Sequence, residues 1–230
     1  MSITKDKAIR KIMVDFEGMS ELTLNQMRLL GKAIHDFGHI PITTESRKQF
    51  NKNERKLDAY EVKLNKQIIQ AIVLYKPVAS ELRGLMACFR MITSLERIGD
   101  LVIKIVNVLL SLKDPGLLLA RAEDMDQMLT VSTEMIAKAI FSFTNNTIEE
   151  AHWVIESDTL IDDLHHDIVQ KAVLDEKFSG DLQRVIFSFI EMKNIISRIE
   201  RIADHATHIA EASIYAHEGT DVRHSGLKKK

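Results

Sequence analysis

The sequence has little of what disulfide-bonded, metal–thiolate or sheet-forming proteins need. Its single cysteine, Cys88, excludes an internal disulfide and a cysteine-rich metal site. No segment alternates apolar and polar residues over a sustained length, so we expect no β-sheet. No glycine-rich loop of the kind that holds nucleotide phosphates is present. Aromatic residues make up only 6% of the chain, and the abundant Leu, Met, Ala, Glu and Lys favour helix.

Net charge and long apolar runs are also lacking. The formal net charge is -2, so no overall positive field favours nucleic acid or an anionic membrane as the partner. The longest apolar segment, 101–112, contains Lys104 and is too short to span a bilayer. The first twenty residues are rich in charge, unlike a secretory leader. We therefore expect a cytoplasmic protein that is at most peripheral to a membrane.

The three prolines divide the chain into long segments of helical period. Pro41, Pro77 and Pro115 each fall between such segments, and proline disrupts the interior of a helix. Asn145-Asn146 and Ser179-Gly180-Asp181 are further breaks, with Thr147 as an expected N-cap. The expected helices are 1–38, 41–75, 77–112, 117–144, 147–177 and 181–217.

The second and third expected helices recur 104 residues later without a gap. The motif Leu95-Glu96-Arg97-Ile98-Gly99-Asp100 corresponds to Ile199-Glu200-Arg201-Ile202-Ala203-Asp204, whereas the first helices of the two halves match poorly. The predicted fold class is therefore all-α, with two similar three-helix bundles formed by an internal duplication. We predict the first bundle at 1–114, the second at 115–220 and a basic tail at 221–230.

Four pairs of acidic residues share one spacing. Two acids four positions apart lie on one face of a helix, about one turn from each other. In the two motifs these acids interrupt apolar stripes rather than extending a charged face. Consecutive helices pack antiparallel, which brings two pairs to one height in each bundle. The first acid set is Glu54, Asp58, Glu96 and Asp100, and the second acid set is Asp158, Asp162, Glu200 and Asp204.

Carboxylates gathered at one height repel one another unless they are protonated, exposed to water or compensated by cations. Hard cations prefer oxygen ligands, and carboxylates can bridge two metal ions. The pattern therefore predicts a metal centre in each bundle, with Glu61 and His165 as additional ligands or as hydrogen-bond partners of the ligands. The alternative is that each Arg-Ile-x-Asp sequence forms a surface ion pair between residues three positions apart.

These motifs resemble those of the PhoU family, the bacterial regulators of phosphate uptake. The resemblance rests on the doubled Glu-Arg-Ile-x-Asp motif, on Pro-Val-Ala-Ser-Glu-Leu-Arg at 77–83 and on the ending Gly-Thr-Asp-Val-Arg-His at 219–224. It covers essentially the whole chain.

The second motif departs from the usual family pattern at two positions. Ala203 and His208 stand where the family usually has glycine and asparagine. The two motifs also differ from each other, because Leu101 and Lys104 in the first correspond to His205 and His208 in the second. The two metal centres are therefore expected to differ.

The resemblance implies a duplicated three-helix bundle whose acid pairs bind multinuclear clusters of iron or zinc, with manganese and magnesium as further candidates. It implies a cytoplasmic protein, commonly a homodimer, that acts near the phosphate-specific ABC transporter and its phosphate-sensing histidine kinase. There it restrains phosphate-starvation signalling and phosphate uptake when phosphate is plentiful. No catalytic reaction is implied. Similar domains also occur attached to sodium–phosphate cotransporters.

Two other functions remain open from the residues alone. A ferritin-like di-iron enzyme also places carboxylates inside a helical bundle, but it needs Glu-x-x-His on two helices. Here only Glu149 and His152 have that spacing, and they lie away from the height of the acid pairs. The other alternative is a helical scaffold without metal, in which the acids face water.

Overall fold

The structure is a computed structural model that describes residues 2–40, 42–112, 114–174 and 182–222. In these residues the chain forms seven helices and no strand, which confirms the all-α class. The helices are α1 (Ser2–His35), α2 (Thr44–Tyr75), α3 (Ser80–Ser111), α4 (Gly116–Ala120), α5 (Ala122–Asn145), α6 (Ile148–Val173) and α7 (Leu182–Glu218). None of these described helices is both long and apolar enough to cross a bilayer.

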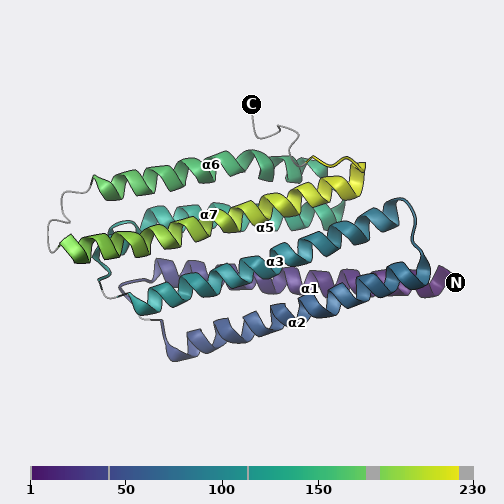
Figure 1. Ribbon diagram of the computed structural model, residues 1–230, viewed down its shortest axis with the longest axis horizontal. Helices are drawn as coiled ribbons and strands as arrows, with labels where there is room; N and C mark the ends of the chain where they lie inside the picture. Colours follow the sequence, from purple (N-terminus) through teal and green to yellow (C-terminus); the bar gives the residue numbers. More distant parts are fainter. Residues whose placement is uncertain (1, 41, 113, 175–181, 223–230) are drawn as a thin grey trace.

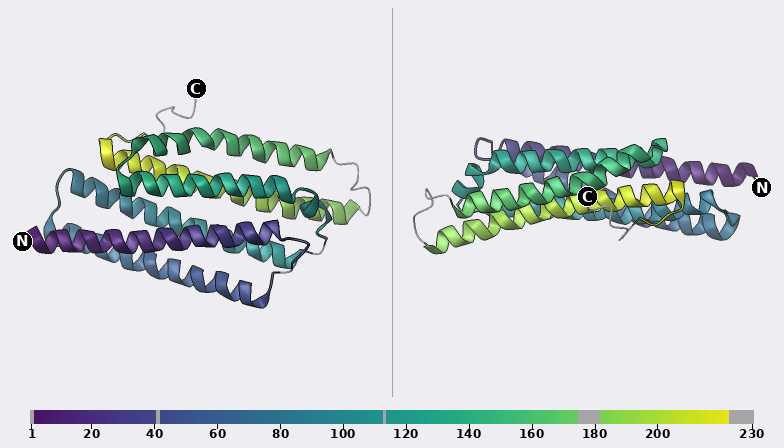
Figure 2. Two further views of the ribbon diagram at one scale, coloured as in Figure 1. Left: turned by 180° about the vertical axis from the view of Figure 1, so that it is seen from behind. Right: turned by 90° about the horizontal axis from the view of Figure 1, so that it is seen from above.

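The six long helices lie in two layers (Figures 1 and 2). Helices α2, α3, α7 and α6 lie side by side in that order, and α1 and α5 cover them on one face. Helices α1 to α3 form one bundle and α5 to α7 the other, as the internal duplication predicts. The most extensive contact between the halves joins α3 to α7. A helix of 32 residues, such as α3, is about 48 Å long, so the molecule is elongated.

The two bundles share one hydrophobic core. Buried apolar side chains from α1 to α7 form a single cluster, as expected when amphipathic helices turn their apolar faces inward. The rings of Phe16 on α1 and Phe143 on α5 meet edge to face at 5.4 Å. The hydroxyl groups of Ser142 and Ser213, both buried, lie 2.7 Å apart between α5 and α7. The halves are therefore packed as one body.

The segment expected as one helix over 117–144 is broken at Arg121. This residue has φ -119° and ψ 10°, and it separates the short α4 from α5. Leu117 and Leu118 of α4 are buried, and α4 contacts α7. The hydroxyl of Ser188 on α7 donates a hydrogen bond to the carbonyl of Asp114, just before α4, at 3.4 Å. No residue in this stretch disfavours helix, so tertiary packing and not local propensity sets the break.

The prolines precede their helices instead of starting them. Helices α2 and α3 begin three residues after positions 41 and 77, so the prediction that Pro41 and Pro77 lie in first helical turns was wrong. The start of α2 is fixed by Thr43, whose side chain accepts a hydrogen bond from the backbone N–H of Ser46 at 3.1 Å. This is the usual N-cap arrangement. Position 41 itself lies outside the described residues.

Two helix ends also differ by a few residues from the expected ones. Helix α1 ends at His35 and α6 at Val173, before the expected positions 38 and 177. Thr147 takes the N-cap position of α6 as expected, although its side chain makes no capping hydrogen bond. The expected break at 179–181, the end of the family signature at 223–224 and the basic tail from 223 lie outside the described residues.

Candidate metal centres

Helices α2 and α3 bring the first acid set together around Glu54. Burial raises the pKa of Glu54 to about 8, and repulsion from Asp100, Asp58 and Glu96 acts in the same direction. Both carboxyl oxygens of Glu54 are closed off from solvent, and no described N–H or alcohol donor reaches them. Buried polar atoms are nearly always hydrogen-bonded. Glu54 is thus a buried acid without a cationic partner, and a hydrogen bond shared with the Asp100 carboxyl group helps to keep its pKa high.

Gly99 makes the space for this buried carboxyl group. A Cβ atom at position 99 would lie 2.5 Å from Cδ1 of Leu57 and 2.8 Å from Oε2 of Glu54. Both distances are shorter than van der Waals contact, so any larger residue would displace α2 or the Glu54 side chain. The second repeat has Ala203 at this position. The second repeat thus combines a larger residue at this position with a shorter acid, Asp158 in place of Glu54.

Glu96 and Asp100 occupy the α3 side of the first set in different surroundings. Burial raises the pKa of Glu96; Arg97 opposes this, and Asp100, Glu61 and Asp58 add to it. Asp100 accepts hydrogen bonds from Lys104 at 3.2 Å and from Arg97 at 3.4 Å. Asp58 is exposed.

Glu61 lies near the first acid set, since its charge raises the pKa of Glu96. The sequence predicted this position. The ion pair between residues three positions apart, expected as the alternative to a metal centre, also forms in this repeat. The first set thus has a buried end at Glu54 and a charge-compensated end at Asp100.

Helices α6 and α7 bring the second acid set together. Nδ1 of His165 on α6 lies 2.7 Å from Oε2 of Glu200 on α7. Burial raises the pKa of Glu200, His165 opposes this shift, and the charges of Asp162 and Asp204 add to it. The structure therefore places His165 against the set, as its position on the acidic face of α6 predicted.

Asp158 has a partner that sequence reasoning missed. It is buried, and its Oδ1 accepts a hydrogen bond from the hydroxyl of Thr207 on α7 at 3.1 Å. Thr207 lies on the same face of α7 as Ala203 and Ala210, so only the helix packing shows its role. The equivalent positions in the first repeat are Glu54 and Ile103. The buried acid is hence supported by a hydroxyl in the second set, whereas in the first set its neighbour is another carboxyl group, Asp100.

The chemistry of both sets suits a multivalent cation. The first offers only carboxylate oxygens, and the second adds an imidazole nitrogen, which iron and zinc also accept. Among the described residues, however, no three acidic, histidine or cysteine side chains are already arranged around one ion position. Coordination would therefore require rotation of side chains such as Asp100 and His165 away from their present partners. Cys88 is buried in the core.

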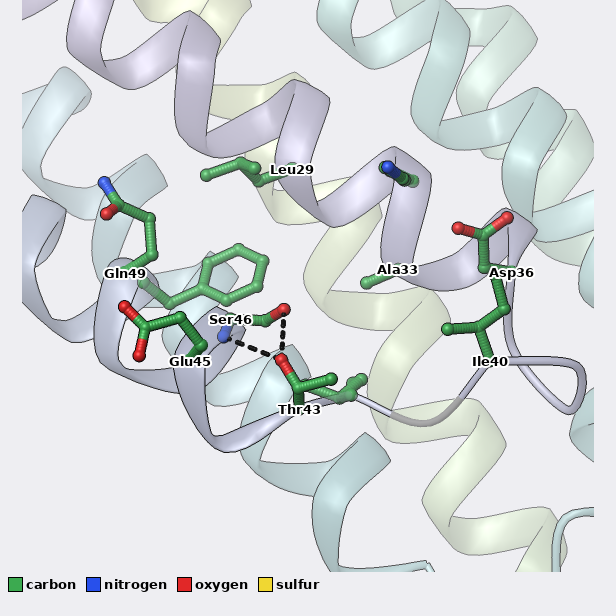
Figure 3. A pocket seen from close by; sticks show the side chains of 11 residues that line it. Leu29, Ala33, Asp36, Ile40, Thr43, Glu45, Ser46 and Gln49 are labelled. Carbon is green, nitrogen blue, oxygen red and sulfur yellow. Dashed lines mark hydrogen bonds between the residues drawn. The ribbon is translucent and has the colours of Figure 1, made fainter.

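A separate depression of about 420 Å³ lies between the end of α1 and the start of α2 (Figure 3). Beside it, Nε2 of Gln49 donates to Oδ1 of Asn53 at 2.8 Å, and Nδ2 of Asn53 donates to Oε1 of Gln26 at 3.4 Å. Phe50, which also lines the depression, precedes Glu54 by one helical turn. The depression shares no side chain with either acid set, so it does not form part of the candidate metal centres.

Comparison with known proteins agrees with this arrangement. Residues 16–109 and 125–213 each match the family model described as the PhoU domain, and these segments contain all eight acids of the two sets. The phosphate-specific transport system accessory protein PhoU homolog of Aquifex aeolicus is 29% identical over 224 residues, covering 96% of this chain and 99% of that protein. The homolog from Burkholderia sp is 28% identical, covering 91% and 90%.

Solved structures show the same fold. The crystal structure of PhoU from Pseudomonas aeruginosa matches with a TM-score of 0.81 at 20% identity, over 94% of this chain and 99% of that chain. The phosphate transport system regulatory protein PhoU from Streptococcus pneumoniae matches with the same TM-score at 21% identity, over 95% and 99%. With both repeats matched to the PhoU domain, this chain belongs to the PhoU family.

Proposed function

We propose that this protein is a metal-binding regulator of phosphate homeostasis that restrains phosphate-starvation signalling and phosphate uptake when phosphate is plentiful. The observation that carries the metal part is Glu54, a buried carboxyl group with no cationic partner, among three further acids. The names of its relatives, which are accessory proteins of the phosphate-specific transport system, support the phosphate part.

The acid sets give such a regulator a way to change its rigidity. Without a cation, the carboxylates of α2 and α3 repel one another, and so do those of α6 and α7. A bound multivalent cation supplies the positive charge that each set lacks. Glu54 and Asp58 would hold it from α2, and Glu96 and Asp100 from α3. The equivalent ligands of the second set would be held by α6 and α7, with His165 as an added nitrogen ligand.

We further propose that the metal is iron or zinc, with manganese or magnesium as substitutes. The protein would act without catalysis, as a cytoplasmic homodimer that contacts the phosphate-specific ABC transporter and its phosphate-sensing histidine kinase. A ferritin-like enzyme is less well supported, because Glu149 of the only Glu-x-x-His sequence is exposed in the first turn of α6. That turn precedes Asp158 by more than two turns of helix.

Elemental analysis of untagged protein tests the metal centres. The variant is the double substitution Glu96→Gln and Glu200→Gln, and the matched control is Glu45→Gln with Glu149→Gln, which removes two exposed acids. We expect more than one metal ion per chain in the wild type and the control, and loss of metal in the first variant.

The regulatory part is tested in cells that lack the gene. A reporter of phosphate starvation should be restrained in high phosphate by the wild type and the control, but not by the metal-site variant. Protein that purifies without metal, stays folded and does not change when metal is added would refute the metal centres. The acids would then form a polar contact surface of a metal-free scaffold.

A further inference from the structure

The contact between α3 and α7 forms a seam along the middle of the molecule (Figure 1). The two helices run antiparallel. Arg83, near the start of α3, lies against Gly219, just after α7, where a Cβ atom would be 3.3 Å from the arginine Nε. At the other end, Ser188 near the start of α7 reaches the carbonyl of Asp114, just after α3. This register places Arg97 opposite His205, midway along the seam.

Cationic side chains from both helices converge on His205. Arg97 of α3 lies opposite His205 in this register, and Arg201 precedes His205 by one turn of α7. The rings of His205 and His208 lie 5.7 Å apart. The middle of the seam is therefore crowded with positive charge.

The duplication explains why these groups meet. Arg97 and Arg201 are equivalent residues of the two repeats. Because α3 and α7 are equivalent helices that cross the seam antiparallel, the two arginines come to the same place instead of to opposite ends. His205 corresponds to Leu101, which is buried. The second repeat thus adds a polar ring to a position that an apolar side chain fills in the first.

The environment of His205 determines which nitrogen carries its proton. Nδ1 is closed off from solvent and has no hydrogen-bond partner. A neutral imidazole has one donor and one acceptor nitrogen, and buried donors without a partner are rarer than buried acceptors without one. The neutral ring therefore keeps its hydrogen on Nε2, the nitrogen that is not closed off.

Only Arg97 on α3, and not Arg201 on α7, forms ion pairs with acidic side chains in the part of the chain that the structure describes. Arg97 lies 3.5 Å from Glu96 and 3.4 Å from Asp100. The ion pairs among the described residues do not include Arg201. A guanidinium group stays charged at all physiological pH values, and its planar set of donors suits oxyanions. Arg201 is thus a permanent charge with donors left for a ligand.

We propose that this seam binds a small tetrahedral oxyanion of the inorganic phosphate class, held by Arg97 and Arg201 with a hydrogen bond from Nε2 of His205. The anion would relieve the repulsion among the cationic groups. The flanking acid sets repel large polyanions, which restricts the ligand to a small ion. None of the proposed metal ligands would contact the anion, although Arg97 is ion-paired with two of them, Glu96 and Asp100.

Calorimetric titration of the full, metal-free chain with inorganic phosphate tests this site, with sodium chloride holding the ionic strength constant. The variants are Arg201→Gln and His205→Leu, the second of which installs the residue of the other repeat. The control is Arg55→Gln, which removes a charge from a shallow basic surface on α2 that also contains Lys48, Lys52 and Lys56. Circular dichroism verifies that each variant is folded.

We expect Arg201→Gln to weaken phosphate binding by roughly tenfold or more, because a charge-assisted hydrogen bond is lost. His205→Leu should weaken it several-fold, and Arg55→Gln should leave it unchanged. The ring signals of His205 and His208 in NMR spectra should shift with phosphate at a fixed pH. Equal binding by Arg201→Gln, equal loss in Arg55→Gln or equal shifts with chloride would overturn the proposal. Binding of O-phosphoserine but not of inorganic phosphate would overturn its assignment to a free ion.

Discussion

Replacing Glu54 with glutamine measures the strain that the first acid set holds when no cation is bound. The glutamine side chain has nearly the same shape as the protonated glutamate but cannot ionise. In metal-free protein we expect Glu54→Gln to be more stable than the wild type at pH 8. At pH 5, where Glu54 is protonated in the folded state, the two proteins should be nearly equal in stability.

The expected gain in stability of Glu54→Gln at pH 8 follows from the raised pKa of Glu54. The folded state holds the proton of Glu54 up to about pH 8, whereas the ordinary value is 4.5. The contribution of this group to stability is therefore fully present below about pH 4.5 and is lost progressively as the pH rises to 8. At about 1.4 kcal/mol per pKa unit the whole shift corresponds to roughly 5 kcal/mol. Partial contact of the side chain with solvent reduces the expected gain of the variant to about 2–3 kcal/mol.

Urea denaturation at pH 5, 6.5 and 8, after removal of metal with a chelator, measures this gain. Glu45→Gln, at the exposed start of α2, serves as the control and should show no pH-dependent difference from the wild type. A Glu54→Gln variant with the same stability difference at all three pH values would refute the reasoning. Added metal should stabilise the wild type more than the variant, because only the ionised Glu54 carboxylate of the wild type can bind the cation through its charge.

Three further perturbations test the packing. Gly99→Ala should destabilise the protein by about 1–3 kcal/mol in urea denaturation, because the new Cβ would lie 2.5 Å from a leucine methyl group of α2. The reverse change in the other repeat, Ala203→Gly, should cost about 1 kcal/mol of helix propensity and about 0.8 kcal/mol for the lost buried methyl group, with no steric clash. An unchanged stability of Gly99→Ala would contradict the steric account. Gln26→Leu should lower stability by about 1–3 kcal/mol, because the buried amide of Asn53 loses its acceptor, and an unchanged midpoint would show that water replaces it. Burial raises the pKa of Cys88 to about 12, so its thiol should react with a chromogenic disulfide at pH 8 only as fast as the protein unfolds; immediate reaction would place it at the surface.

The fold and the grouping of the acids were predictable because both depend on local rules. Helical period and proline positions define the long helices, and the offset of 104 residues shows the duplication. Asp58 and Glu96 are equally far from Pro77 in the sequence, so antiparallel packing alone places them at one height. The close approach of Gly99 on α3 to the Glu54 and Leu57 side chains on α2 agrees with that height. Whether metal binds there remains a prediction.

The features that were missed all depend on contacts between elements far apart in the chain. The break at Arg121 arises because α4 packs against α7, and no residue in that stretch indicates it. Thr207 looks like part of an apolar face until α6 is placed against it. Arg97 and Arg201 lie away from the apolar stripes of their own helices. Their convergence follows from the register of α3 and α7, which periodicity within one bundle does not determine.

The order of the front helices, α2, α3, α7 and α6, gives this layer an alternating pattern of charge: acidic, basic, acidic. Because the two halves are repeats related by antiparallel central helices, the pattern is nearly unchanged by a half-turn of the molecule in its own plane. A partner that recognises only this charge pattern could therefore bind in two almost equivalent orientations. Among the positions that break this equivalence are Leu101 against His205 and Lys104 against His208. For such a partner, the direction of docking would be set by the substitutions between the repeats and not by the fold.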